Sequence, residues 1–60
     1  MEYLTVEMLN GKHVTIRIDT ILGVEESESG SRIYVYWRDE PIDVSDKSCD
    51  IDIKLRLGLN

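Results

Sequence analysis

Hydrophobic and polar residues alternate along two stretches near the start of the chain. The apolar positions of these stretches are Leu4, Val6 and Met8 in the first and Val14, Ile16 and Ile18 in the second. A period of two places side chains alternately on the two faces of a strand, so each stretch predicts a half-buried β-strand. Asn10-Gly11 lies between them and predicts a hairpin turn.

Hydrophobic matching decides the register of this hairpin. A two-residue turn at Asn10-Gly11 would pair Val6 with Thr15, and apolar side chains would then face polar ones. A three-residue loop, with Gly11 in the left-handed conformation of a bulge, instead pairs Val6 with Val14. We therefore predict the bulged turn.

The middle of the chain contains the strongest strand signal. Residues 21–24 fit a short strand or a single turn, and residues 25–31 read as a polar loop. β-Branched and aromatic residues then follow one another from Arg32 to Trp37, which predicts a strand. Both faces of this strand are apolar, with Ile33, Val35 and Trp37 on one and Tyr34 and Tyr36 on the other. One face can enter the core, and the other needs a different cover.

The last third of the chain also predicts strands. Residues 38–41 fit a turn, and residues 42–44 fit a brief edge strand because Pro41 cannot donate to a central ladder. From about Asp50 to Leu57, apolar residues alternate with charged ones, which predicts a final strand. A helix would spread these apolar groups around its circumference. Before this strand, the polar residues have room to cap one short helical turn near residues 45–49.

Five or six short strands with tight connections predict an all-β, mainly antiparallel fold for residues 1–60 as a single domain. Such a meander forms either a twisted sheet or an open barrel. A chain of 60 residues buries a small share of its surface, and the lone Cys49 excludes an intrachain disulfide. Small cores are usually stabilised by disulfides, by a structural metal or by a second subunit, and only the second subunit remains for this chain. We therefore expect a homodimer that self-associates through Tyr34 and Tyr36.

Three short runs and one single residue are similar to the sequence pattern of a known family. They are Met8 to Lys12 with its Leu-Asn-Gly turn, Gly23 to Glu26, Ile33 to Val35, and Val44. Over about residues 8–45, they resemble the FlbD/SwrD family of small flagellar and swarming-motility proteins. The resemblance implies a non-enzymatic motility accessory. The chain departs from the family pattern where residues 38–41 break the expected second hairpin, and the segment 50–57 has no counterpart.

The sequence offers no grouping of residues for catalysis. The one histidine, His13, lies on the polar side of the hairpin without a nucleophile beside it. Asp50 and Asp52 share a face of the predicted strand, a spacing that fits the start of a hard-metal site or an acid–base pair, with a solvated acidic face as the alternative. Asp43, Asp46 and Asp50 lack the glycine and the terminal glutamate of a calcium loop. Glycine-rich phosphate loops and zinc-ligand spacings are absent too. We therefore expect a protein that is not an enzyme and has no cofactor and no metal site.

Twelve acidic and seven basic residues give a net charge of −5. Nearly all of it lies in residues 39–52, which contain six acidic residues and one lysine. This charge repels phosphate backbones, so we expect no direct contact with nucleic acid. The first residues lack a basic region, and no stretch approaches the roughly 20 apolar residues of a membrane span. We expect a cytoplasmic protein without membrane contact.

Three functional hypotheses remain. The first is a small acidic inhibitor, of the phage anti-defence kind, whose carboxylates imitate phosphates and bind a host nucleic-acid-handling protein. Its contact residues would be Asp39, Glu40, Asp43 and Asp46. The second is the motility accessory, and the third is a small nucleic-acid-binding barrel that stacks bases on its aromatic residues. Against the first stands the alternative that these acids only maintain solubility and discourage edge-to-edge pairing.

Overall fold

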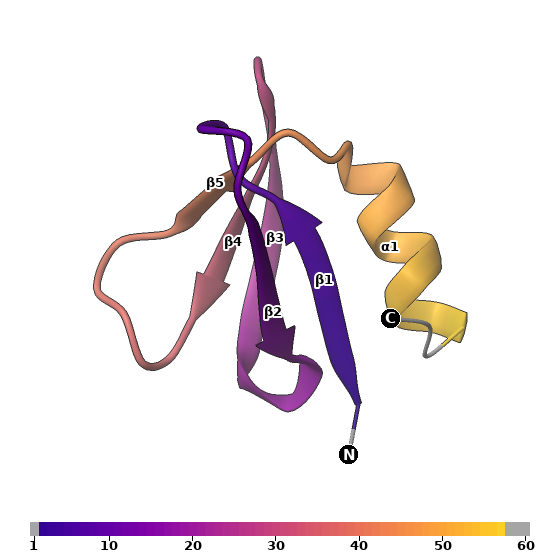
Figure 1. Cartoon of the computed structure of the whole chain (residues 1–60). Coiled ribbons are helices and arrows are strands. Elements are labelled where there is room, and N and C mark those ends of the chain that lie inside the picture. The colour runs from indigo at the N-terminus through magenta and orange to yellow at the C-terminus, as the bar shows by residue number, and fades with distance from the viewer. Residues whose placement is uncertain (1, 58–60) are drawn as a thin grey trace.

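The computed structural model describes residues 2–57 (Figure 1). In chain order, its elements are β1 (Tyr3–Glu7), β2 (His13–Arg17), the 3-10 turn η1 (Ile18–Thr20), β3 (Ile21–Ser27), β4 (Gly30–Val35), β5 (Ile42–Val44) and α1 (Ser48–Leu57). β1 and β2 form one antiparallel sheet, and the second has the order β3-β4-β5. The prediction of a mainly antiparallel β-protein is confirmed in this part of the chain, with five strands in two sheets rather than a closed barrel and with one helix.

The hairpin of β1 and β2 has the predicted bulged register. Val6 lies opposite Val14. Gly11 has a φ of 89°, in the left-handed region, and its N–H donates to the carbonyl oxygen of Met8 at 2.9 Å. The N–H of Met8 donates to the carbonyl of Lys12 at 2.7 Å and closes the loop. Hydrophobic matching therefore identified the correct turn.

The second sheet is longer than the sequence indicated. β3 continues through Ser27, β4 begins at Gly30, and only Glu28 and Ser29 form the turn between them. The predicted polar loop 25–31 is therefore wrong. Its polar residues fit a strand because an antiparallel sheet buries one face and leaves the other in water. Of the two alternatives for residues 21–24, the strand is observed, and β5 confirms the predicted strand at 42–44.

The aromatic strand ends earlier than predicted. β4 stops at Val35, so Tyr36 and Trp37 belong to the following turn and not to two faces of a strand. Trp37, which was predicted to share a face of this strand with Val35, is 51% exposed, whereas Val35 is buried. β3 begins at Ile21, opposite Val35, and β5 reaches only as far as Ile33, so neither neighbouring strand extends to residues 36 and 37.

The predicted strand over residues 50–57 is wrong, because these residues belong to α1. Ile51 is fully buried, whereas Ile53 is 53% exposed, so the alternating apolar residues do not share one face. Ile51 and Leu55 are four positions apart, lie on the same side of the helix and pack against the core. The expected helical turn near 45–49 corresponds only to the beginning of α1, which starts at Ser48.

Charges along α1 suit a helix better than a strand. Asp50 lies in the first turn, and Lys54 and Arg56 lie in the last, which complements the helix macrodipole. Asp52 and Arg56, four residues apart, form an ion pair of 3.0 Å. This order of charges was present in the sequence and contradicts the strand prediction.

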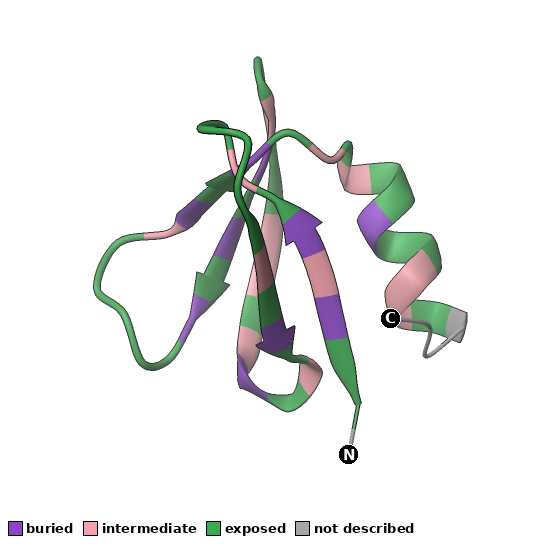
Figure 2. Ribbon diagram, viewed as in Figure 1, coloured by how far each residue is buried: buried purple, intermediate pink, exposed green. Residues whose placement is uncertain are grey.

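The core lies between the two sheets and α1 (Figure 2). Buried side chains alternate with exposed ones along β1, β4 and β5. The fully or nearly fully buried apolar residues are Leu4, Val6, Ile16, Ile33, Val35, Ile42, Val44 and Ile51. One helix residue, Ile51, thus closes a core that the strands build from both sheets.

Candidate functional site

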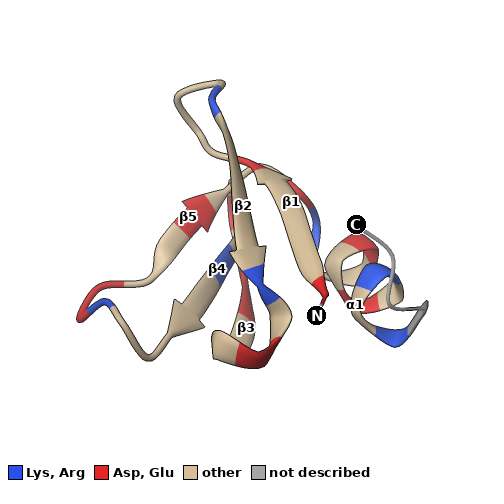
Figure 3. Ribbon diagram, turned by 60° about the horizontal axis from the view of Figure 1, so that its bottom comes forward, with Lys and Arg blue, Asp and Glu red and all other residues tan. Residues whose placement is uncertain are grey.

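The acidic segment 39–52 does not form one surface. Asp39 and Glu40 lie in the loop between β4 and β5, whereas Asp50 and Asp52 lie on α1. Figures 1 and 3 show this loop and the helix on opposite sides of the molecule. The charge that is continuous in sequence is therefore divided between two separate regions.

Asp43 belongs to a ladder of charges across the outer face of the second sheet. Arg32, on β4, lies opposite Asp43 of β5 and Glu25 of β3. Its guanidinium approaches the Asp43 carboxylate at 3.4 Å and the Glu25 carboxylate at 3.3 Å. The hydrogen bond to Glu25 raises the pKa of Arg32. Arg32 thus offsets part of the negative charge that Asp43 offers to a partner.

Tyr34 is tied to the same ladder. Its hydroxyl donates to the Glu25 carboxylate at 3.0 Å, and the side chain is 37% exposed. This hydrogen bond is the main cause of the raised pKa of Tyr34, because ionisation of the phenol would remove the donor. Tyr36 is 67% exposed and lies beyond the end of β4. The two predicted self-association residues are therefore in different surroundings.

Asp46 makes three contacts with the body of the protein. One carboxylate oxygen accepts a hydrogen bond from the N–H of Glu7 at 2.8 Å, and the other lies 3.6 Å from the ammonium of Lys54. Its carbonyl accepts a hydrogen bond from the buried Ser31 hydroxyl at 2.7 Å. The side chain is only 19% exposed. These contacts give Asp46 a structural part, which leaves less of its carboxylate for a partner.

Together with the bond from Glu7 to Asp46, three further contacts cover one edge of β1. The N–H of Ser45 donates to the carbonyl of Glu7 at 2.8 Å, and the ammonium of Lys54 donates to the carbonyl of Thr5 at 3.3 Å. An isolated bridge joins Met8 to Val44 beside them. Backbone groups that would otherwise form an open strand edge are thereby occupied.

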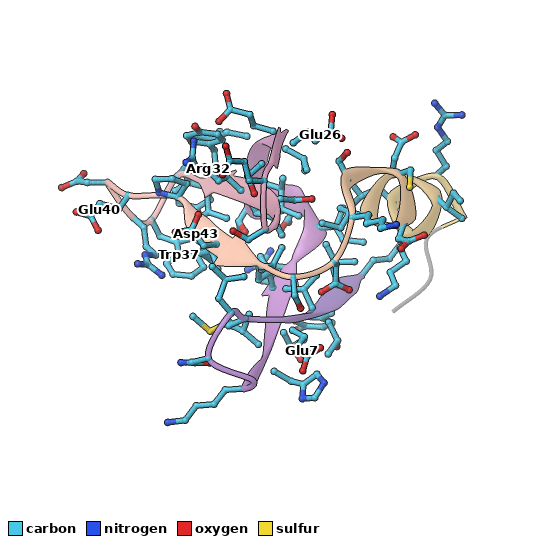
Figure 4. All side chains as sticks on the ribbon, turned by 90° about the horizontal axis from the view of Figure 1, so that it is seen from above. Glu7, Glu26, Arg32, Trp37, Glu40 and Asp43 are labelled. Atoms are coloured by element: carbon cyan, nitrogen blue, oxygen red, sulfur yellow. The ribbon has the colours of Figure 1, made fainter. Side chains whose placement is uncertain are left out.

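The loop between β4 and β5, residues 36–41, presents the remaining predicted acids. Its first five residues are all exposed, and they combine the aromatic Tyr36 and Trp37 with Arg38 and the acidic Asp39 and Glu40. Figure 4 shows Glu40 pointing away from the body of the protein, with Trp37 closer to the sheet. We call these six residues the aromatic–acidic loop.

Thr20 fixes the base of the aromatic–acidic loop. Its carbonyl accepts a hydrogen bond from the N–H of Tyr36 at 3.3 Å, and its hydroxyl accepts one from the indole of Trp37 at 3.2 Å. The same hydroxyl donates to the carbonyl of Arg17 at 2.7 Å. Thr20 is 5% exposed. Nothing in the alternation of the sequence singles out this residue, which acts through contacts between distant segments.

The described residues contain no group of three or more histidine, cysteine, aspartate or glutamate side chains placed to hold a metal ion. Cys49 is exposed, and His13 is exposed on β2 opposite Glu7. Within residues 2–57, no helix is both long and apolar enough to cross a bilayer.

Comparison with protein-family models, curated proteins and solved structures finds no match for this chain. The resemblance to the FlbD/SwrD family therefore stays a prediction.

Proposed function

We propose that this protein is a non-catalytic binding module that holds a basic partner protein through the aromatic–acidic loop. The observation that carries the proposal is the run of five exposed residues, 36–40, which joins two aromatic side chains to two carboxylates on an anchored base. Asp43 extends this surface along β5. The partner is a protein that handles nucleic acid, and binding inhibits it.

Charge and aromatic area have different parts in this proposal. Asp39 and Glu40 attract a basic surface over the screening length of about 10 Å at 0.1 M salt and raise the association rate. Tyr36 and Trp37 provide the apolar contact that slows dissociation, because aromatic residues dominate the energetics of binding interfaces. A nucleic-acid-binding groove offers cations for phosphates and apolar surfaces for bases, so it suits both features.

The experiment begins with capture of a partner from host lysate treated with nuclease, followed by kinetic measurement with the purified partner. Asp39→Lys with Glu40→Lys should slow association markedly, and moderate salt should weaken wild-type binding. Glu2→Lys with Asp50→Lys is the matched control, since it makes the same change in net charge at exposed positions outside the loop. Equal effects of the two double variants, or binding indifferent to salt, would refute the charge-based proposal.

Competition distinguishes mimicry from other protein binding. If the loop occupies the nucleic-acid site of its partner, a DNA or RNA oligonucleotide that the partner binds should displace the protein. The indole of Trp37, the only tryptophan, then reports binding and displacement by fluorescence. Simultaneous binding of the oligonucleotide and the protein would contradict the proposed inhibition.

We also propose that the chain forms a homodimer through Tyr34, on the outer face of β4, and Tyr36, beyond the end of that strand. Because Tyr36 also belongs to the aromatic–acidic loop, the homodimer and the complex with the partner exclude one another. Light scattering at low micromolar concentration tests this proposal. Tyr36→Lys should shift the dimer towards the monomer, and a wild-type protein that is monomeric and stably folded would contradict it.

A further inference from the structure

A groove follows β3 on the side that faces α1. One part has a volume of about 580 Å³ and lies between residues 21–24 of β3 and the helix residues Ser48, Cys49, Asp52 and Leu55. An adjoining part of about 380 Å³ is lined by residues 26–30, by Ser45 and Lys47, and again by Ser48 and Cys49. Because the two parts share Ser48 and Cys49, they extend one behind the other along the strand.

One wall of the groove is an unpaired strand edge. Among the described residues, β3 pairs with β4 alone, and its other side faces the helix. An edge strand presents N–H and C=O groups that an added strand can bond. β3 has seven residues, and at about 3.3 Å per residue its edge spans roughly 20 Å.

The floor and rim of the groove provide apolar contact. Leu22 lies at the irregularity in the pairing between Ile21 and Gly23 and is 72% exposed, the largest exposure among the exposed large apolar residues. A side-chain methyl group added at Gly23 would meet no heavy atom within 4 Å, so space remains beside Leu22. Leu55 faces this space from the helix.

Charge determines which occupant suits the groove. Its acidic lining residues are Glu26, Glu28 and Asp52, and its one basic lining residue is Lys47. Asp52 is paired with Arg56, but such an exposed pair contributes at most about 1 kcal/mol and a bound cation can replace it. A second copy of this chain, with a net charge of −5, would bring more negative charge to the groove. A basic segment is favoured instead.

We propose that the groove between β3 and α1 binds an extended segment of a partner protein, in which apolar residues alternate with lysine or arginine. The segment adds a strand to the edge of β3, so its backbone supplies hydrogen bonds whatever its sequence. Alternate side chains of a strand point to opposite faces. The apolar set faces the helix and contacts Leu55 and the neighbouring Leu22. The basic set starts from the opposite face, and its long side chains bend over the rim to reach Glu26, Glu28 and Asp52. This surface is separate from the aromatic–acidic loop, and the inference does not rest on the function proposed for that loop.

Cys49 makes the groove directly measurable. It is the only cysteine, it is exposed, and it lines both parts of the groove. An occupant should therefore slow its reaction with a thiol-reactive dye. The probe is the acetylated and amidated peptide Lys-Val-Lys-Val-Lys-Val-Lys. At ten times its Kd the reaction should slow about tenfold, because only the unoccupied fraction reacts.

Two control peptides separate the contribution of side-chain charge from that of backbone hydrogen bonds. The same peptide with glutamate in place of lysine should give no protection, and a version with N-methyl groups on alternate backbone nitrogens should lose it, because strand addition needs those N–H groups. Protection by the glutamate peptide, or none by the lysine peptide up to about 1 mM, would overturn the proposal.

Matched variants locate the site. Leu22→Asn should abolish protection, whereas Leu9→Asn, the same change at a 53% exposed position outside the groove, should leave it intact. Glu26→Lys with Glu28→Lys should weaken the lysine peptide at low salt. Asp39→Lys with Glu40→Lys, in the aromatic–acidic loop, should have little effect on Cys49 protection. Loss of protection to the same extent in the Leu9 and Leu22 variants would contradict a site beside β3.

Discussion

Replacement of Gly30 by alanine is expected to destabilise the protein by about 3–5 kcal/mol. Gly30 begins β4 with a φ of 146°, a conformation that residues with a Cβ rarely adopt. A Cβ built there would collide with the carbonyl oxygen of Val44 and lie 2.7 Å from the carbonyl carbon and 2.8 Å from the oxygen of Ser45. All three are backbone atoms, so no side-chain rotation can relieve the contact.

The size of the effect follows from two contributions. Backbone strain at a positive φ costs about 1–3 kcal/mol. Moving Ser45 away would also weaken its bond to Glu7 and the adjoining bond from the Ser31 hydroxyl to Asp46, each worth about 1 kcal/mol. The sum of about 3–5 kcal/mol is comparable to the total stability of about 3–9 kcal/mol expected for 60 residues.

Gly23→Ala is the matched control. Gly23 has no positive φ, and an added methyl group meets open space. This variant should be neutral or more stable by about 0.4–1 kcal/mol, because alanine restricts the unfolded chain. Urea denaturation followed by far-ultraviolet circular dichroism measures both variants. A Gly30→Ala protein that lost less than about 1 kcal/mol would refute the reasoning, because strain alone should cost that much.

Four further predictions address the helix, the covered edge of β1, the loop anchor and the tyrosine ladder. Ile51→Ala should cost about 2–4 kcal/mol and the exposed Ile53→Ala under about 0.5, whereas equal costs in urea denaturation would contradict the helix. Asp46→Ala should cost about 1–3 kcal/mol because the N–H of Glu7 loses its acceptor, and Asp46→Asn, which keeps one, should cost clearly less in the same assay. Thr20→Val should cost about 1–3 kcal/mol and alter Trp37 emission, unlike the exposed Thr15→Val; unchanged emission would argue against the anchor. The pKa of Tyr34 is raised in the folded protein, so the stability that its hydrogen bond to Glu25 contributes is full below the ordinary value of 10.0 and is lost as the pH rises through the folded value. Between pH 8 and pH 11, wild type should therefore lose stability relative to Tyr34→Phe. Parallel plots of unfolding free energy against pH would exclude this contribution.

Sequence reasoning succeeded where local geometry and hydrophobic matching agree. The bulged turn at Gly11 and the pairing of Val6 with Val14 follow from a period of two and from the conformational freedom of glycine. It failed over α1 because Ile51, Ile53 and Leu55 satisfy the strand pattern, while two of them also satisfy the helical spacing of four. The order of acidic and basic residues was the evidence that should have decided between these interpretations.

The candidate surfaces were harder to predict, since they depend on where the elements meet. Asp46 and Asp39 belong to one acidic segment, yet the first contacts β1 and the second lies in an exposed loop. The anchor at Thr20 joins residues seventeen positions apart. The groove beside β3 depends on a helix in place of the predicted strand. Tertiary placement, which a single sequence does not encode in its periodicity, determined each of these features.

The covered edge of β1 has a consequence for biosynthesis. Asp46 and Lys54 act on a strand that is complete by residue 7, so the contacts span 39 and 49 positions. On the ribosome, the β1–β2 hairpin emerges well before either of these residues. Its edge can meet other nascent chains during that interval, when unpaired strand edges are prone to aggregate. The interval between the emergence of Arg17 and that of Lys54 from the ribosome therefore sets how long that exposure lasts.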